Sequence, residues 1–113
     1  MRRGRRSPTL IDGRPIHWVS LDKRRPAVVL TRAGVVPVRR QVTVAPITSR
    51  VRGLSVEVLV GRDQGLEHDS VVNVDNVQTV PCAAVGAFIG ILTPVQERLL
   101  ARAIRYAFDL EEA

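Results

Sequence analysis

The sequence is poor in residues that build disulfide or metal-bound frameworks. It contains one cysteine, Cys82, which excludes an internal disulfide and leaves no Cys/His spacing for a zinc site. Its two histidines, His17 and His68, stand near no second histidine or serine arrangement typical of a nucleophilic triad, so each is more simply structural. Glu67 and Asp69 lie close together, but no further acidic cluster joins them. Metal-dependent nuclease chemistry is therefore disfavoured, and we expect no metal and no cofactor.

Long apolar runs are also absent. No apolar stretch approaches the roughly 18 residues of a membrane span, and the arginine-rich start, "MRRGRRSPTLIDG", has no apolar segment behind it. We expect neither a signal peptide nor an anchor, and hence a cytoplasmic protein without membrane contact. Residues 1–13 offer little to bury, so we expect a basic, mobile extension ahead of one domain at 14–113.

Lysine is nearly absent, although the chain is strongly basic. Of the 17 basic residues only Lys23 is a lysine, and the net charge is +6 with a pI near 11.2. Arginine binds phosphate through two parallel donors, and a basic excess favours an anionic partner such as nucleic acid. Arginine-rich composition also follows from GC-rich coding, so the charge alone leaves the partner open.

What the sequence does have is a series of short, β-branched apolar segments. At 113 residues and 45% hydrophobic, it suits a single domain with one modest core. Breaks rich in charge, glycine or proline separate the segments, at 23–25, 33–40, 49–53 and 61–68. The pattern predicts strands at 15–21, 27–32, 41–48, 54–60, 69–77 and, more weakly, 83–92. No glycine-rich phosphate loop appears, which disfavours a nucleotide-binding α/β fold.

The end of the chain changes to helical periodicity. Thr93 as N-cap, Pro94 at the first helical position and Gln96 three residues after the cap predict a capping-box start. Val95, Leu99, Ala103, Tyr106 and Leu110 share one face, flanked by Leu100 and Ala107, and we expect that face to pack on the sheet. A separate row, Arg98, Arg102 and Arg105, is more simply a solvated face than a nucleic-acid contact. The order of elements predicts an α+β fold: a small, strongly bent antiparallel sheet or barrel with a C-terminal helix.

Polar residues interrupt the predicted strands at three places. Arg25 precedes Pro26 at the entrance of an apolar strand, and Thr48 closes "VTVAPIT" before the arginine-bearing "SRVRG". The segment "DNVQT", at 75–79, places amides within an apolar stretch. Strand ends on one side of a small sheet commonly converge, so these positions are candidates for a site.

The order and spacing of these segments resemble the MazF/PemK-like toxin endoribonucleases. The likeness rests on "PIHWVSLD", "RRPAVVLTR", "VTVAPITSR", "VEVLV", "GLEHDSVVNVDNVQTV" and the C-terminal helix, and it covers residues 14–110. Within that family the chain is most similar to the short mycobacterial MazF toxins. The resemblance implies the CcdB/PemK-like toxin fold, an SH3-like barrel.

The resemblance also implies a catalytic pair. Arg25, before the proline, and Thr48, in "PIT", match the family's catalytic arginine and threonine. Such toxins cut single-stranded RNA without a metal, leaving a 2′,3′-cyclic phosphate and a 5′-OH, and so arrest translation and growth. A fixed guanidinium beside a hydroxyl suits the charge that builds on the phosphate oxygens. Because arginine is a poor base, electrostatic stabilisation by Arg25 comes first and proton transfer second.

Further residues are candidates for RNA binding. The loop after Thr48 offers groups for backbone phosphates, and the amides of the 75–79 segment can contact exposed base edges; each of these residues is equally explained as a turn or cap residue. The family's longer "GxEQxGxRP" loop has no counterpart here, so Lys23 and Arg24 in the shortened turn would take over its RNA contacts. Asn76 replaces the glutamine that is usual in the family. The candidates are Lys23, Arg24, Ser49, Arg50, Arg52, Asn76 and Gln78.

The implied partners are RNA, a second copy of the chain in a homodimer, and a cognate MazE-like antitoxin whose acidic segment would suit a basic groove. Two alternatives stay open. A CcdB-like toxin of the same fold poisons DNA gyrase by binding, but those proteins use an exposed, Trp-bearing C-terminus, whereas this chain ends "FDLEEA" and has only Trp18. A catalytically silent RNA-binding barrel is the other.

Overall fold

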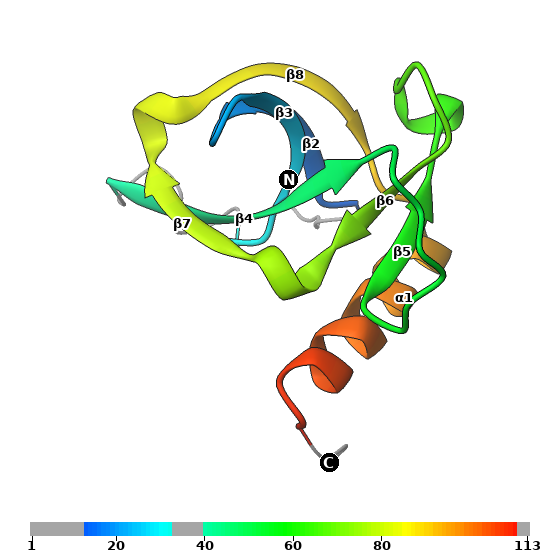
Figure 1. Cartoon of the computed structure of the whole chain (residues 1–113). Helices are drawn as coiled ribbons and strands as arrows, with labels where there is room; N and C mark the ends of the chain where they lie inside the picture. The colour runs from blue at the N-terminus through cyan, green and yellow to red at the C-terminus, as the bar shows by residue number, and fades with distance from the viewer. Residues whose placement is uncertain (1–12, 33–39, 111–113) are drawn as a thin grey trace, which may run out of the picture.

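The computed structural model describes residues 13–32 and 40–110, and Figure 1 shows their arrangement. The predicted extension before Gly13, most of the predicted loop at 33–40, and residues 111–113 lie outside the described residues. The strands are β2 (Pro15–Ser20), β3 (Arg24–Val29), β4 (Gln41–Thr48), β5 (Glu57–Val60), β6 (Ser70–Asn73), β7 (Gln78–Pro81) and β8 (Val85–Ile91). The helices are the short 3-10 turns η2 (Arg62–Gln64), η3 (Val74–Asn76) and η4 (Cys82–Ala84), and α1 (Pro94–Ala107).

The seven strands form one curled antiparallel sheet, with the order β5-β6-β4-β3-β2-β8 and β7 paired to β4. β4 is the central element. One of its edges pairs with β3, while the other pairs first with β7 along 41–44 and then with β6 at 47–48. The turn η3 therefore sits beside β4 where its two partners meet. In Figure 1 the sheet curls into a half-barrel and α1 lies at one side of it. The predicted bent sheet with a C-terminal helix is confirmed.

The sheet curls around two apolar clusters. One lies between α1 and the sheet and includes Ile16, Val28 and Leu100. The other is enclosed by β2, β3, β4 and β7 and includes Val19 and Val44. Because β3 and β4 are covered on both faces, their sequences "AVV" and "VTVA" are nearly continuous in β-branched and small apolar residues rather than alternating.

The helix begins as predicted but buries a different face. The Thr93 hydroxyl accepts from the Gln96 N–H, and the Gln96 side chain accepts from the Thr93 N–H, which completes the capping box. The expected face is wrong: Leu99 and Tyr106 are exposed. The helix packs instead through Leu100, with Ala103, Ile104 and Ala107. Small residues at 103 and 107 allow close approach to the sheet, and the two apolar stripes overlap at 103, so periodicity alone did not separate them.

One predicted strand is too long. The segment 69–77 was expected to be continuous, but β6 ends at Asn73, the chain turns through η3, and β7 begins at Gln78, beyond the predicted segment. The polar pair Asp75 and Asn76 is exposed and unsuited to the core, so the chain breaks there. In contrast, the segment predicted at 41–48 is β4 without change. Among the described helices, none is long and apolar enough to cross a membrane.

Candidate active site

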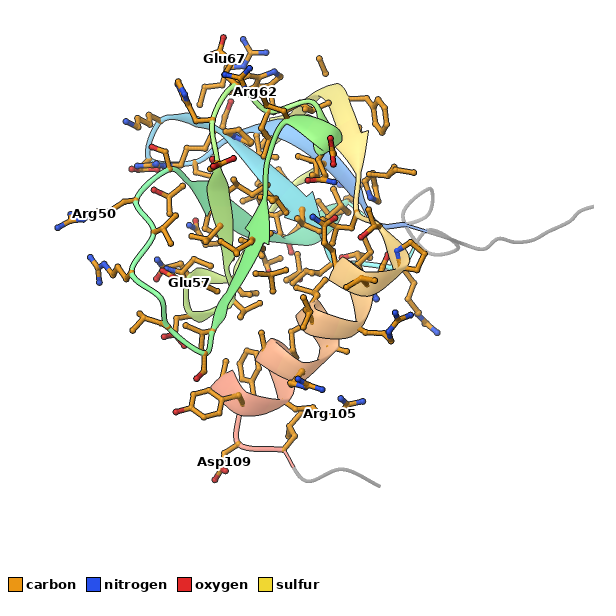
Figure 2. The ribbon with its side chains drawn as sticks, turned by 90° about the vertical axis from the view of Figure 1, so that its right-hand side faces the viewer. Arg50, Glu57, Arg62, Glu67, Arg105 and Asp109 are labelled. Atoms are coloured by element: carbon orange, nitrogen blue, oxygen red, sulfur yellow. The ribbon has the colours of Figure 1, made fainter. Side chains whose placement is uncertain are left out.

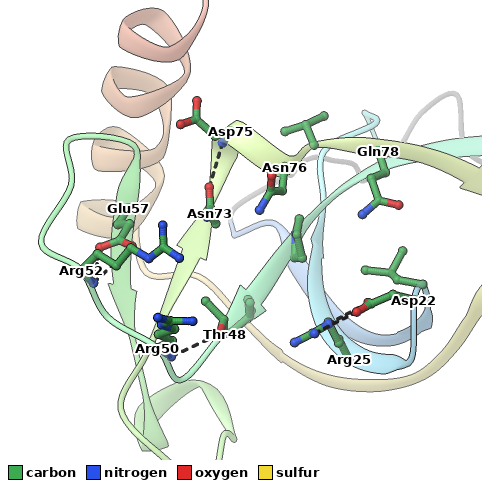
Figure 3. A pocket seen from close by; sticks show the side chains of 14 residues that line it. Asp22, Arg25, Thr48, Arg50, Arg52, Glu57, Asn73, Asp75, Asn76 and Gln78 are labelled. Carbon is green, nitrogen blue, oxygen red and sulfur yellow. Dashed lines mark hydrogen bonds and ion pairs between the residues drawn. The ribbon is translucent and has the colours of Figure 1, made fainter.

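An open cavity of about 590 Å³ lies beside the end of β4 (Figure 3). Its walls come from three places: the turn between β2 and β3 with the start of β3, the end of β4 with the loop that leads into β5, and the segment from β6 through η3 to β7. The polar residues that line it are Asp22, Arg25, Thr48, Arg50, Arg52, Glu57, Asn73, Asp75, Asn76 and Gln78. Six of the nine residues predicted for the site are therefore together in one cavity.

Sheet register brings Arg25 and Thr48 to the same place. β3 and β4 pair with Ala27 opposite Pro46 and Val28 opposite Ala45. Continuing this antiparallel register by two residues sets Arg25 opposite Thr48 and on the same side of the sheet as Pro46, which also lines the cavity. The predicted turn residue Arg25 is thus part of strand β3, which holds its backbone in the sheet.

Arg25 is held by a carboxylate that was not among the residues predicted from the sequence. Its Nε and Nη2 donate to Oδ1 and Oδ2 of Asp22 at 2.9 and 3.0 Å, a parallel two-bond contact. The Arg25 guanidinium lowers the pKa of Asp22 well below its usual range, and the same bonds raise the pKa of Arg25. Guanidinium has five N–H donors, and Asp22 occupies two. No described residue bonds to the remaining edge, which could bind a second anion while the cation stays oriented.

The loop after β4 is held from within. The Thr48 hydroxyl oxygen accepts from the Arg50 N–H at 3.1 Å, so the hydroxyl hydrogen is left to donate elsewhere. Glu57 accepts from the backbone N–H groups of Arg52, Gly53 and Leu54. Figure 2 shows Arg50 reaching outward from this loop, with Glu57 on the inner side of the loop. Among the described residues, no hydrogen bond or ion pair engages the side chains of Arg50 and Arg52.

The third wall presents amides. Asn73 ends β6, and its Oδ1 accepts from the Asp75 N–H at 2.9 Å, which caps η3. Asn76 is the last residue of η3, and Gln78, the first residue of β7, pairs with Val44. Both amides are exposed and line the cavity.

Three predicted residues lie outside the lining of this cavity. Lys23 and Ser49 are exposed in the turns on either side. The guanidinium of Arg24 stacks over the ring of Trp18, 5.0 Å from its centroid, on the opposite side of β3 from Arg25. RNA binding by these three stays a prediction. His17 hydrogen-bonds the Gly86 carbonyl through Nδ1 and meets Phe88 edge to face, which agrees with a structural histidine.

Four polar residues of the cavity were not predicted from the sequence: Asp22, Glu57, Asn73 and Asp75. The first three bind a neighbour within five residues along the chain: Asp22 binds Arg25, Glu57 binds the loop before it, and Asn73 binds η3. An acidic residue three positions before the candidate arginine, within a turn, was the one signal available for Asp22. For Glu57 the sequence showed only an apolar strand interrupted by a charge.

No three His, Cys, Asp or Glu side chains come together as a possible metal site in residues 13–32 and 40–110. Fold and site together define a small half-barrel protein whose central cavity combines arginine, threonine and side-chain amides, groups suited to phosphate and to base edges.

Comparison with known proteins identifies the family. The model of the PemK-like, MazF-like toxins of type II toxin-antitoxin systems matches residues 15–108. The chain is 53% identical over 98 residues to "Endoribonuclease MazF3" of Mycobacterium tuberculosis, covering 87% of this chain and 95% of that protein. This chain belongs to the PemK-like, MazF-like toxin family, and the resemblance found in the sequence is confirmed.

Solved structures agree. The structure described as "Mycobacterium tuberculosis toxin MazF-mt6" superposes with a TM-score of 0.86 at 52% identity, covering 88% of this chain and 100% of that one. An "Endoribonuclease in complex with its cognate antitoxin from Mycobacterial species" superposes with a TM-score of 0.79 at 20% identity, over 93% of this chain and 100% of that one. The second likeness concerns the fold alone.

Proposed function

We propose that this toxin is an endoribonuclease that cuts single-stranded RNA in the cavity beside β4, without a metal, through Arg25 and Thr48. Family membership and the identity with MazF3 support the class of activity. The observation that carries the assignment of the site is the register of β3 and β4, which brings the two residues to one side of the sheet and into one cavity.

The reaction we propose uses the RNA's own nucleophile. The ribose 2′-oxygen forms a bond to the adjacent phosphorus while the bond from phosphorus to the 5′-oxygen breaks. The 2′-hydroxyl loses its proton and the leaving 5′-oxygen gains one, so the products are a 2′,3′-cyclic phosphate and a 5′-OH. Negative charge gathers on the non-bridging oxygens, where the free edge of Arg25 and the Thr48 hydroxyl would donate hydrogen bonds.

The Asp22 contact favours a charge-stabilising role for Arg25 over proton transfer. Because Asp22 raises the pKa of Arg25, the guanidinium is an even poorer base than a free arginine. Asp22 acts here as a positioning residue: it fixes the plane of the guanidinium and leaves one edge toward the cavity.

RNA recognition would be divided between the other two walls. Arg50 and Arg52 would contact phosphates, and Asn76 and Gln78 would bind base edges of an unpaired strand. Lys23 and Ser49 lie in the turns beside the cavity and Arg24 lies on the other side of β3; all three would contact the strand beyond the cavity. An RNA substrate implies that the toxin acts in the cytoplasm.

The remaining partners we propose are protein chains. A cognate MazE-like antitoxin would block the cavity, in line with the complex of the structural neighbour. A second copy would pair through the apolar stripe of α1, since Val95, Leu99 and Tyr106 are all exposed there. The two α1 stripes would then form a two-fold interface, in which the same residues of each copy make the contact.

The test is to incubate the protein with a mixed pool of single-stranded RNA in EDTA and map the cleaved ends. Cyclic phosphate and 5′-OH ends at a recurring sequence are expected. Uncut RNA, or undiminished cutting by an Arg25→Ala variant, would overturn the proposal. RNA that is bound but never cut would support the silent RNA-binding barrel. Trapping of cleaved supercoiled DNA with gyrase would support the CcdB-like alternative.

A further inference from the structure

We propose that Glu57 and Asn73 are positioning residues for RNA recognition: a cross-strand pair that holds both the arginine-bearing loop and the amide-bearing turn at the cavity. The inference rests on the proposed function. It concerns how the second and third walls of the cavity are kept in place relative to each other, and involves neither Arg25 nor Thr48.

Glu57 supplies the order of the arginine-bearing loop. Its Oε1 accepts from three consecutive backbone N–H groups, those of Gly53 at 2.8 Å, Arg52 at 3.0 Å and Leu54 at 3.1 Å, and its Oε2 approaches Arg52 N at 3.3 Å. Three successive N–H groups directed at one point form a concave anion site, which an internal carboxylate fills here. Residues 50–54 have no regular secondary structure and are exposed, so this carboxylate is their main anchor.

Asn73 does the same for the amide-bearing turn. Its Oδ1 accepts from the Asp75 N–H at 2.9 Å and caps η3, the turn that ends at Asn76 and leads to Gln78. A side-chain cap of this kind gives a partner to an N–H group that the turn itself leaves unpaired. With the cap in place, Asn76 and the start of β7 enter the cavity at a set angle.

The two anchors are neighbours. In the ladder between β5 and β6, Glu57 pairs directly with Asn73, and both side chains line the cavity. Figure 3 shows them on adjacent strands, each turned toward the segment that it holds. The paired strands β5 and β6 thus fix the distance between the arginines proposed to contact phosphates and the amides proposed to bind base edges. Preorganisation of this kind raises affinity by lowering the ordering cost on binding.

The sign of the effect separates this role from simple electrostatics. Glu57 is a carboxylate in a cavity proposed to bind phosphate, so charge alone predicts that its removal tightens RNA binding. The positioning role predicts weaker binding. Asp75 is the matched control: it lines the same cavity, and no hydrogen bond or ion pair engages its carboxylate among the described residues. Asp75→Asn removes the same charge while keeping the backbone N–H that Asn73 binds.

The experiment measures affinity for a pool of single-stranded RNA with 2′-fluoro riboses, which cannot form the cyclic phosphate, at several salt concentrations. Glu57→Ala is expected to weaken binding about tenfold, and Glu57→Gln less, because one carbonyl oxygen can still accept. The salt slope should fall by about 0.7 for each phosphate that the loop arginines no longer neutralise. Asn73→Ala is expected to weaken binding about threefold without changing the salt slope. Asp75→Asn should leave binding unchanged or tighter.

Cleavage of natural RNA provides the second readout. KM is expected to rise in Glu57→Ala while kcat stays within about twofold, because Arg25 and Thr48 are held by other contacts. Binding that is unchanged or tighter in Glu57→Ala, as in Asp75→Asn, would overturn the inference, and so would a fall in kcat at unchanged KM. If the unsubstituted protein fails to cut RNA in EDTA, the proposed function fails instead. A melting temperature within a few degrees of the parent protein shows that each variant is folded.

Discussion

Two walls of one cavity carry arginines, and they are built in opposite ways. At the start of β3, the side chain of Arg25 is fixed: its backbone belongs to the strand, and Asp22 in the preceding turn binds two of its nitrogens. In the loop between β4 and β5, the backbone is fixed by Glu57, while the guanidinium groups of Arg50 and Arg52 have no partner among the described residues.

The difference matches two tasks that the proposed function would require of the site. Stabilising a transition state needs a charge whose position is settled before the reaction, because reorganisation during the reaction costs rate. Binding a flexible strand needs charges that can follow the phosphates, and long free side chains do this at some entropic cost. The first wall therefore suits chemistry and the second suits recognition. Substitutions in the two walls should change different kinetic constants.

The largest effect is expected from Arg25→Ala, which removes the fixed cation. Cleavage should fall about a thousandfold in kcat, since the proposed charge stabilisation is removed while RNA contacts in the other wall remain. Arg25→Lys should rescue little, because an ammonium cannot make the parallel contacts of a guanidinium. Single-turnover cleavage with saturating protein measures this constant directly. Arg62→Ala, an exposed change in η2 that also removes one positive charge, is the control and should cut at the parent rate.

Thr48→Ala is expected to follow, with a loss of about a hundredfold in kcat. The threonine is half-buried at the end of β4 and lines the cavity, and its hydroxyl oxygen accepts from the Arg50 N–H, which leaves the hydroxyl hydrogen for RNA. Thr48→Ser keeps that hydroxyl and should retain most of the activity. Thermal unfolding should change little in either variant. A loss of thermal stability that accounted for the loss of activity would mean that Thr48 is structural.

Asp22→Asn should reduce kcat about tenfold, because the guanidinium loses its orienting carboxylate but keeps its charge. The pKa of Asp22 is lowered and that of Arg25 is raised, so the pair stays ionised throughout pH 5 to 9. Any stability from the pair is present above the usual aspartate pKa, about 3.9, and is lost as the pH falls through the lower folded value. The ratio of parent to variant kcat should therefore be constant from pH 5 to 9. A ratio that changes within that range would mean that Asp22 exchanges protons during the reaction.

Sequence reasoning named the side chains that we propose to react or to bind RNA, but not the side chains that hold them. Arg25, Thr48, Arg50 and Arg52 stand in recognisable motifs, and the strand pattern was sufficient to predict the sheet that joins them. Asp22, in contrast, acts through a contact across a turn, and its role depends on side-chain geometry that a pattern of residue types does not carry.

The same limit explains the errors in the fold. The break between β6 and β7 depends on β4 having two successive partners along one edge, which is a property of the assembled sheet. The buried side of α1 depends on where Ala103 and Ala107 let the helix approach the sheet. Local periodicity correctly predicted whether a segment is a helix or a strand. Packing determined where β6 ends and which face of α1 is buried.

The smallest effects are expected from Arg50→Ala and Arg52→Ala, which test the second wall alone. Each should weaken binding of uncleavable RNA a few-fold and reduce the salt slope by about 0.7, the change for one phosphate contact on a single strand. Neither should alter kcat at saturating RNA, because the reacting phosphate is held by the first wall. Combined with Arg25→Ala, their free-energy effects on kcat/KM should add, since the two walls share no partner. Strong non-additivity, or a fall in kcat as large as that of Thr48→Ala, would show that the loop arginines move into the reaction centre, and the division between a chemical wall and a recognition wall would then be wrong.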